Sequence, residues 1–176
     1  LPEVPRANIL AEPMGRNTAP CVGWAAAVVA RRDPRGVMMV LPADHHIGDV
    51  PSFLDVLERS VAAARGGGLV TVGIRPTRPE TGYGYLEVGD EIASGVHRAV
   101  RFVEKPVRAK AEEFLAGGRH LWNSGMFFFR ADVVRAAIAS CLPEVSSLLD
   151  RYDAAAREGT EARTIAATYG DMPNVS

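Results

Sequence analysis

The segment Val37-Met38-Met39-Val40-Leu41-Pro42-Ala43-Asp44-His45-His46 is typical of a strand that ends in a carboxylate. Its apolar run suits a strand that is buried on both faces of a parallel sheet. Pro42 has no N–H to donate to a neighbouring strand, so the strand is expected to end there. Asp44 would then emerge at the carboxyl end of a central strand, where open α/β sheets bind their ligands. This carboxylate is therefore a candidate for holding a cation against phosphate groups.

The rest of the chain predicts an α/β fold with a mixed, mostly parallel sheet flanked by helices. Strands alternate with helices in the first half, which predicts parallel strands joined by right-handed crossovers. In the second half, two segments alternate polar and apolar residues like half-exposed strands. We expect strands at 7–11, 37–41, 69–74, 85–88, 96–103 and 125–129, and helices at 18–32, 52–65, 109–115, 131–140, 142–157 and 161–168.

Length and composition favour one globular domain. The 176 residues are 47% hydrophobic and 23% charged, and the formal charge of −1 offers no basic field for nucleic acid. No apolar run approaches the roughly 20 residues that span a bilayer. The N-terminal residues lack the pattern of a signal peptide and begin without Met, so we expect a cytoplasmic fragment. Cys21 and Cys141 are interpreted as two buried thiols rather than a disulfide.

The loop Glu12-Pro13-Met14-Gly15-Arg16-Asn17 precedes a predicted helix, whose N-terminus presents free N–H groups. The Glu12 carboxylate has two acceptor oxygens, which match the N1–H and N2 amino donors of guanine. The alternative is that Asn17 or Thr18 merely caps the helix and Glu12 is a solvated charge.

Three further segments carry candidate ligand groups, each with a structural alternative. Residues 75–85 include Tyr83 and Gly84, which suit a sugar or simply enter a hairpin. Glu104 and Lys105 end a strand, where they could bind a hydroxyl and a phosphate or form an exposed ion pair. Asn123, in Trp122-Asn-Ser-Gly-Met, offers an amide at the start of the next strand or marks a turn.

The Asp44-His45-His46 triplet also suggests a metal-dependent phosphoesterase. Adjacent side chains of an extended segment point in opposite directions, so the two histidines cannot easily share one ion. The other histidines lie in no ligand pattern. We therefore expect the imidazoles to bond to backbone near Asp44.

The order of these motifs resembles the mannose-1-phosphate guanylyltransferases of the bacterial type. The resemblance covers nearly the whole chain and implies a Rossmann-like nucleotidyltransferase domain that joins GTP and mannose 1-phosphate into GDP-mannose and pyrophosphate. The motifs are Glu12-Pro-x-x-Arg16-Asn-Thr-Ala-Pro20, Leu41-Pro-Ala-Asp-His45, Arg78-Pro-Glu-Thr-Gly-Tyr-Gly84, Glu104-Lys-Pro106 and Trp122-Asn-Ser-Gly-Met-Phe127.

The resemblance also implies residue roles. Asp44 would bind Mg²⁺, and Lys105 would bind the sugar phosphate as the second catalytic residue. The guanine end would lie by Glu12, Arg16 and Asn17, and mannose by Tyr83, Gly84, Glu104 and Asn123. A homodimer is allowed, and neither nucleic acid nor a membrane is an expected partner.

The family's Gly-rich phosphate loop belongs before residue 1, and its second Mg²⁺-binding Asp belongs after Ser176. We therefore expect residues 1–176 to form a partial catalytic domain that is inactive alone. Two alternatives remain: a sugar nucleotidyltransferase with another base or sugar, and a non-catalytic relative that senses nucleotide sugars.

Overall fold

The computed structural model describes residues 3–175, which form two compact units. Within the described residues, unit 1 is made of residues 3–36 and 130–175, and unit 2 is made of residues 37–129. The chain therefore passes between the units twice, after Gly36 and after Phe129.

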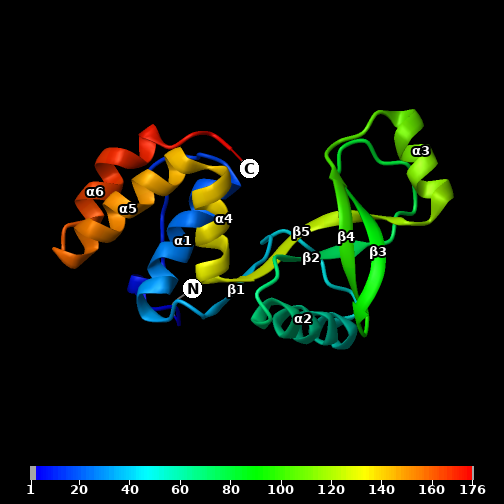
Figure 1. Ribbon diagram of the computed structural model, residues 1–176, viewed down its shortest axis with the longest axis horizontal. Coiled ribbons are helices and arrows are strands. Elements are labelled where there is room, and N and C mark those ends of the chain that lie inside the picture. The colour runs from blue at the N-terminus through cyan, green and yellow to red at the C-terminus, as the bar shows by residue number, and fades with distance from the viewer. Residues whose placement is uncertain (1–2, 176) are drawn as a thin grey trace. The chain divides into compact units, whose positions relative to one another are not determined.

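Unit 1 is helical (Figure 1). Asn17 caps its first long helix, and the helix ends in two arginines that favour the negative end of the helix dipole. Pro143 begins another helix at a position where its missing N–H costs nothing. The helices are α1 (Thr18–Arg32), α4 (Ala131–Cys141), α5 (Pro143–Arg157) and α6 (Glu161–Thr168), with the short 3₁₀ segments η1 (Arg6–Asn8) and η2 (Tyr169–Asp171).

The core of unit 1 is built around Trp24 of α1. Its ring packs edge-on against Tyr152, at 6.1 Å between centroids, and at a tilt against Tyr169, at 5.7 Å. Gly23 lets α5 approach closely, since a β-carbon there would lie 2.9 Å from Cδ1 of Leu149. The helices of this unit therefore pack through large, fully enclosed side chains.

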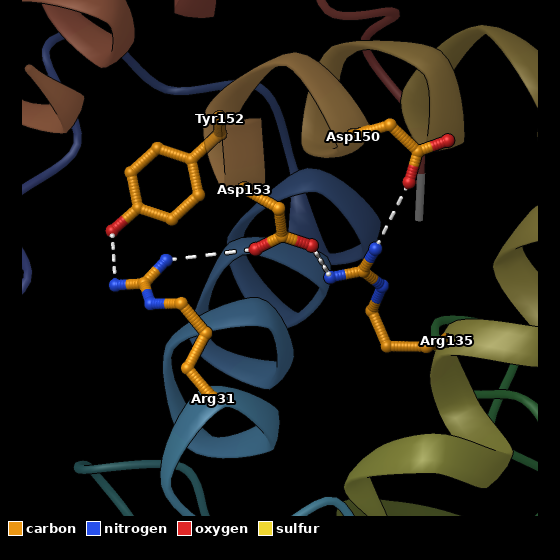
Figure 2. A network of polar contacts seen from close by, with 5 residues as sticks. All are labelled: Arg31, Arg135, Asp150, Tyr152 and Asp153. Carbon is orange, nitrogen blue, oxygen red and sulfur yellow. Dashed lines mark hydrogen bonds and ion pairs between the residues drawn. The ribbon is translucent and has the colours of Figure 1, made fainter. Parts of the chain in front are cut away.

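An ion-pair network ties three of these helices together (Figure 2). Asp153 of α5 lies between Arg31 of α1, at 3.5 Å, and Arg135 of α4, at 2.7 Å. Arg135 also pairs with Asp150 at 3.1 Å, and Arg31 donates to the Tyr152 hydroxyl at 3.2 Å. Asp153 and Arg135 are each only 20% exposed, so this network is better shielded from water than a surface ion pair.

Unit 2 is a five-stranded sheet with two helices (Figure 1). The strand order is β1-β5-β3-β4, and β2 also pairs with β5. The elements are β1 (Val37–Val40), α2 (Val50–Arg65), β2 (Val70–Ile74), β3 (Tyr85–Ala93), β4 (Val96–Val103), α3 (Arg108–Gly117) and β5 (His120–Arg130).

Each helix of unit 2 covers its own small core. Met126 and Phe128 of β5 are buried with Ala64 of α2. Phe114 of α3 is buried with Tyr85 and Trp122. β5 supplies a buried side chain to both cores, and its burial alternates along much of its length as expected for a sheet with two faces.

Two predictions about strands are wrong. Residues 7–11 contain no strand and instead continue from the 3₁₀ turn η1, whose first residue follows Pro5. The sheet is not mostly parallel, because β2–β5, β3–β4 and β3–β5 are all antiparallel. The alternation of strands and helices along the sequence did not predict that the β3–β4 hairpin pairs with β5. It also did not predict that β5 runs antiparallel to β2 and β3.

The strand at 37–41 is confirmed, but its predicted burial and central position are wrong. β1 lies at the end of the strand order, and Met39 is 52% exposed. An end strand has a neighbour on one side only, so its apolar residues are only partly covered.

Most other predicted elements are confirmed. The bounds of 18–32, 96–103 and 161–168 match the structure, whereas β3 and β5 are longer than expected. The thiols are unpaired as expected, but Cys141 is exposed and Cys21 only half-buried. Among residues 3–175, no helix has the length and apolarity needed to cross a membrane.

Candidate functional site

Five of the predicted site residues lie together in unit 2. Tyr83, Gly84, Glu104, Lys105 and Asn123 form what we call the β3–β5 cluster. The Asn123 N–H donates to the Gly84 carbonyl at 2.8 Å, and the Lys105 N–H donates to the Tyr83 carbonyl at 3.1 Å. Three segments far apart in the sequence are thus joined by backbone hydrogen bonds.

In the β3–β5 cluster, Gly84 lies where the neighbouring side chains leave no space for a β-carbon. A β-carbon on this residue would lie 2.8 Å from Oε2 of Glu104 and 2.6 Å from Cζ of Phe102. Both distances are too short for any side chain. Gly84 therefore lets the Glu104 carboxylate and the Phe102 ring reach the backbone of the entering loop.

Lys105 has a strained backbone, with φ at +43°. A residue with a β-carbon pays about 1–3 kcal/mol for such a conformation, which is found most often at functional sites. Its side chain is 65% exposed, and its ammonium group lies 3.7 Å from the Glu104 carboxylate. The exposed ion pair given as the alternative for these two residues is therefore present, and both groups remain open to a ligand.

The loop before Gly84 is held in place by Trp122. The Tyr83 ring meets Trp122 edge-on at 5.3 Å, and the Arg78 guanidinium lies 5.5 Å from the same indole. Glu80 accepts from Arg78 and from the Gly82 N–H, and these hydrogen bonds, the Gly82 one foremost, lower the pKa of its carboxyl. The loop is also the entry to a hairpin, as the structural alternative stated.

The Asn123 motif lies inside β5 rather than at its start, so the turn given as the alternative is wrong. β5 begins at His120, and Asn123 faces Gly73 of β2. The register of the β2–β5 pair shifts beside this motif, and Gly125 has φ at +73°. The motif is therefore a bulge in a strand.

Asp44 lies in an exposed turn after β1. Pro42 lies against Gly125, where a β-carbon would be 3.5 Å from Cγ of the proline. Asp44 is two residues after Pro42 in the sequence, and Asn123 is two residues before Gly125. The turn with Asp44 therefore leaves β1 beside the β3–β5 cluster.

The donor set around Asp44 fits only part of a metal site. Within the described residues, 3–175, no group of three or more His, Cys, Asp or Glu side chains is placed to hold an ion. His45 and His46 are exposed. Mg²⁺ at nucleotide sites is usually bound by one or two carboxylates together with phosphates and water, so a single carboxylate fits as one ligand.

In unit 1, two of the three candidate residues, Glu12 and Arg16, contact the C-terminal segment. Glu12 accepts a hydrogen bond from the Tyr169 hydroxyl, and Arg16 donates to the Gly170 carbonyl. The Ala19 N–H, in the first turn of α1, donates to the Val175 carbonyl at 3.1 Å. The loop before α1 is thus joined to residues more than 150 positions away.

Asn17 caps α1, which confirms the structural alternative for this residue. Its side chain accepts from the Thr18 N–H at 3.0 Å. Its backbone is strained, with φ at +67° and ψ at −167°. Among residues 3–175, Asn17 and Lys105 are the two residues other than glycine with positive φ, and both belong to the predicted site.

Burial and the neighbouring Glu12 carboxylate raise the pKa of two groups in unit 1. Burial, followed by the bond to Glu12, raises the pKa of the Tyr169 hydroxyl far above its usual value. Burial and then the Glu12 charge also raise the pKa of the Cys21 thiol. Both groups therefore stay protonated beside the carboxylate.

Sequence reasoning did not identify several residues that shape the site. Tyr169 and Gly170 had no local signal, because their partners lie at the other end of the chain. Phe102 was read only as part of an alternating strand. Thr71 was read only as part of an apolar run, yet it contacts Asn123.

Comparison with known proteins identifies relatives of this chain. A mannose-1-phosphate guanylyltransferase of Klebsiella pneumoniae is 42% identical over 157 residues, which cover 88% of this chain and 33% of the relative. The xanthan biosynthesis protein XanB of Xanthomonas campestris is 50% identical over 123 residues, which cover 70% of this chain and 26% of that protein. The chain thus spans about a third or less of the length of these relatives.

The fold has a close counterpart among solved structures. The crystal structure of mannose-1-phosphate geranyltransferase from Thermus thermophilus matches with a TM-score of 0.85 and 35% identity, over 95% of this chain and 47% of that one. The family model described as "Nucleotidyl transferase" matches residues 3–163. The chain belongs to the nucleotidyl transferase family.

Proposed function

We propose that this chain is part of an enzyme that transfers GMP from GTP to mannose 1-phosphate, giving GDP-mannose and pyrophosphate. A phosphate oxygen of the sugar phosphate attacks the α-phosphorus of GTP, and the bond to the β-phosphate breaks in line. The observation that carries the proposal is the β3–β5 cluster, in which a carboxylate, an amide and an ammonium group lie together within a nucleotidyl transferase fold.

The proposed roles divide between sugar and phosphate. The Glu104 carboxylate and the Asn123 amide bind mannose hydroxyls, with the Gly84 backbone against the ring and Tyr83 beside it. Lys105 binds the sugar phosphate and orients it for attack, supported by the exposure of its ammonium group. No covalent enzyme intermediate is required.

Asp44 is the proposed ligand for Mg²⁺. The cofactor, when bound, would neutralise charge that develops on the phosphates. Asp44 supplies one carboxylate from an exposed turn beside the β3–β5 cluster, which suits an ion shared with nucleotide phosphates. In the protein expressed from its complete coding sequence, Asp44→Asn should lower kcat at least about 100-fold and leave Tm unchanged. Activity retained by this variant would remove Asp44 from the mechanism.

In unit 1, we propose that Glu12, Arg16 and Asn17 serve the guanine end of GTP. One oxygen of Glu12 accepts from Tyr169, and a carboxylate has about four acceptor sites, so acceptor sites remain for the base donors. We further propose a cytoplasmic enzyme that acts on free nucleotide and sugar phosphate, without nucleic acid or a membrane.

The direct test is pyrophosphate release by the protein expressed from its complete coding sequence. Release should require both GTP and mannose 1-phosphate, and ATP, UTP or dTTP should replace GTP poorly. A preference for UTP or dTTP would assign the protein to another sugar nucleotidyltransferase class. Nucleotide-sugar binding without turnover would make it a sensor.

A further inference from the structure

The bulge in β5 raises the question of what holds the Asn123 amide in one orientation. Thr71 of β2 lies opposite Phe127 of β5, and Gly73 lies opposite Asn123. An advance of two residues along β2 therefore corresponds to an advance of four residues along β5. The two extra residues of β5 lie within the segment 124–126. Gly125 in this segment has the positive φ that the bulged backbone requires. Such a segment lacks the regular ladder that would otherwise fix its side chains.

Thr71 of β2 crosses this gap with its hydroxyl. Its Oγ1 lies 2.9 Å from Oδ1 of Asn123 and 2.9 Å from the carbonyl oxygen of Met126. The hydroxyl has a single proton, so it donates to one of these two oxygens at a time, and its donation to Oδ1 joins β2 to the Asn123 amide. A second hydroxyl, that of Ser124, accepts from the Met126 N–H at 3.1 Å within the bulge itself.

The Gly125 N–H decides which arm of the amide faces Thr71. It lies 3.3 Å from Oδ1 of Asn123 and can only donate, so the oxygen arm must point into the bulge. The two arms of an amide point apart, which leaves the NH₂ directed away from Thr71 and Gly125. Within residues 3–175, no hydrogen bond uses that NH₂, so its two donors are available to a ligand.

We propose that Thr71 is a positioning residue for the sugar phosphate: its hydroxyl holds the Asn123 amide with the NH₂ presented to a sugar hydroxyl. The inference rests on the proposed role of Asn123 in binding mannose. Thr71 itself does not touch the substrate and acts only through the amide that it orients. Without the hydroxyl, only the long 3.3 Å hydrogen bond from the Gly125 N–H holds the oxygen arm, so the amide can rotate and donate to the bulge carbonyls instead.

The test removes the hydroxyl while keeping the shape of the side chain. In the protein expressed from its complete coding sequence, Thr71→Val should raise KM for mannose 1-phosphate about five- to tenfold. KM for GTP should stay unchanged, since the nucleotide does not depend on this amide. Thr71→Ser, which keeps the hydroxyl, should restore KM to within about twofold, and Thr71→Ala is the second test if valine is not accommodated.

A matched control removes a threonine hydroxyl elsewhere. Thr164→Val deletes a hydroxyl that donates to the Thr160 carbonyl at 3.2 Å in α6, and it should change neither KM. If Thr71→Val raised the KM of both substrates equally, or if serine failed to restore KM, Thr71 would have a general structural role and the inference would be wrong.

The variant Asn123→Ala tests the proposed role of Asn123 separately from the role of Thr71. If this variant raises KM for mannose 1-phosphate and Thr71→Val does not, the inference fails and the proposed function stands. If Asn123→Ala leaves that KM unchanged, the proposed role of Asn123 fails, and the role of Thr71 fails with it.

Discussion

The two units use their candidate site residues in opposite ways. In unit 1, Glu12 and Arg16 are bonded to Tyr169 and Gly170, and Asn17 caps a helix. In unit 2, the Glu104 and Lys105 side chains are 56% and 65% exposed and form an ion pair with each other. The candidates of unit 1 therefore stabilise their own unit, whereas the charged groups of Glu104 and Lys105 in unit 2 remain exposed to a ligand. Substitutions should separate the two cases, by stability in unit 1 and by sugar affinity in unit 2.

The largest effect is expected from adding a side chain at Gly84 in unit 2, where neighbouring atoms leave no space for one. Gly84→Ala should raise KM for mannose 1-phosphate about ten- to a hundredfold, because the new methyl group displaces both the Glu104 carboxylate and the Phe102 ring. Tm should change little, since the Phe102 ring is 50% exposed and can swing outward.

Gly82→Ala is the matched control for this change. It lies two residues away in the same loop, and its β-carbon would meet Oε1 of Glu80 at an ordinary 3.5 Å. Equal KM values for the two variants would show that the loop, rather than the close approach at Gly84, sets sugar affinity.

Glu12→Gln probes the opposite behaviour of unit 1. The amide keeps the shape but loses the charge that accepts from Tyr169, so unfolding free energy should fall by about 1–2 kcal/mol, measured by chemical denaturation. The preference for GTP over ATP should fall at the same time, because an amide offers one acceptor where the carboxylate offers two.

Tyr169→Phe separates these two effects. It removes the same hydrogen bond and leaves the Glu12 carboxylate in place. It should reproduce the loss of stability and keep the preference for GTP. Loss of that preference in both variants would mean that Glu12 acts only by holding its own loop.

A smaller effect concerns pH and belongs to unit 2, which contains all four histidines. Both ring nitrogens of His120 are buried without a hydrogen-bond partner, and its ring stacks on Phe114 of α3 at 3.8 Å. Burial lowers the pKa of His120. Glu87 opposes this shift, while Arg101, Arg119 and Lys110 reinforce it.

A histidine whose pKa is lower in the folded state stabilises the fold fully above its unfolded pKa of about 6.5 and loses that contribution as pH falls. Amide exchange protection of α3 should therefore fall between about pH 7 and 5 more than that of α1, and His120→Gln should remove the difference. His97→Gln, an exposed site, is the control. An equal fall in both helices would place the titrating group elsewhere.

Local patterns in the sequence predicted the helices well and the sheet poorly. The caps and end residues of α1 are neighbours in sequence, so its bounds could be read directly. The pairing of β2 with β5 depends on residues about 50 positions apart, and no local pattern states its direction. The strand expected at 7–11 failed for the same reason, because short apolar runs become strands only where a partner is available.

The site shows the same division. The motifs identified residues that unit 2 does bring together, because glycine and charge at strand ends have local physical reasons to be there. The contacts of Glu12 and Arg16 with η2 join the two ends of the chain. Thr71 was hidden because a threonine in an apolar strand reads as an ordinary β-former.

The central claim is that unit 2 binds the sugar phosphate through groups that its own fold leaves unused. Glu104→Gln tests this claim most directly, because the side chain is exposed and its one ion pair is with the adjacent Lys105. In the protein expressed from its complete coding sequence, KM for mannose 1-phosphate should rise about tenfold, while Tm and KM for GTP stay unchanged. An unchanged KM for mannose 1-phosphate, or a rise in KM for GTP instead, would contradict the account.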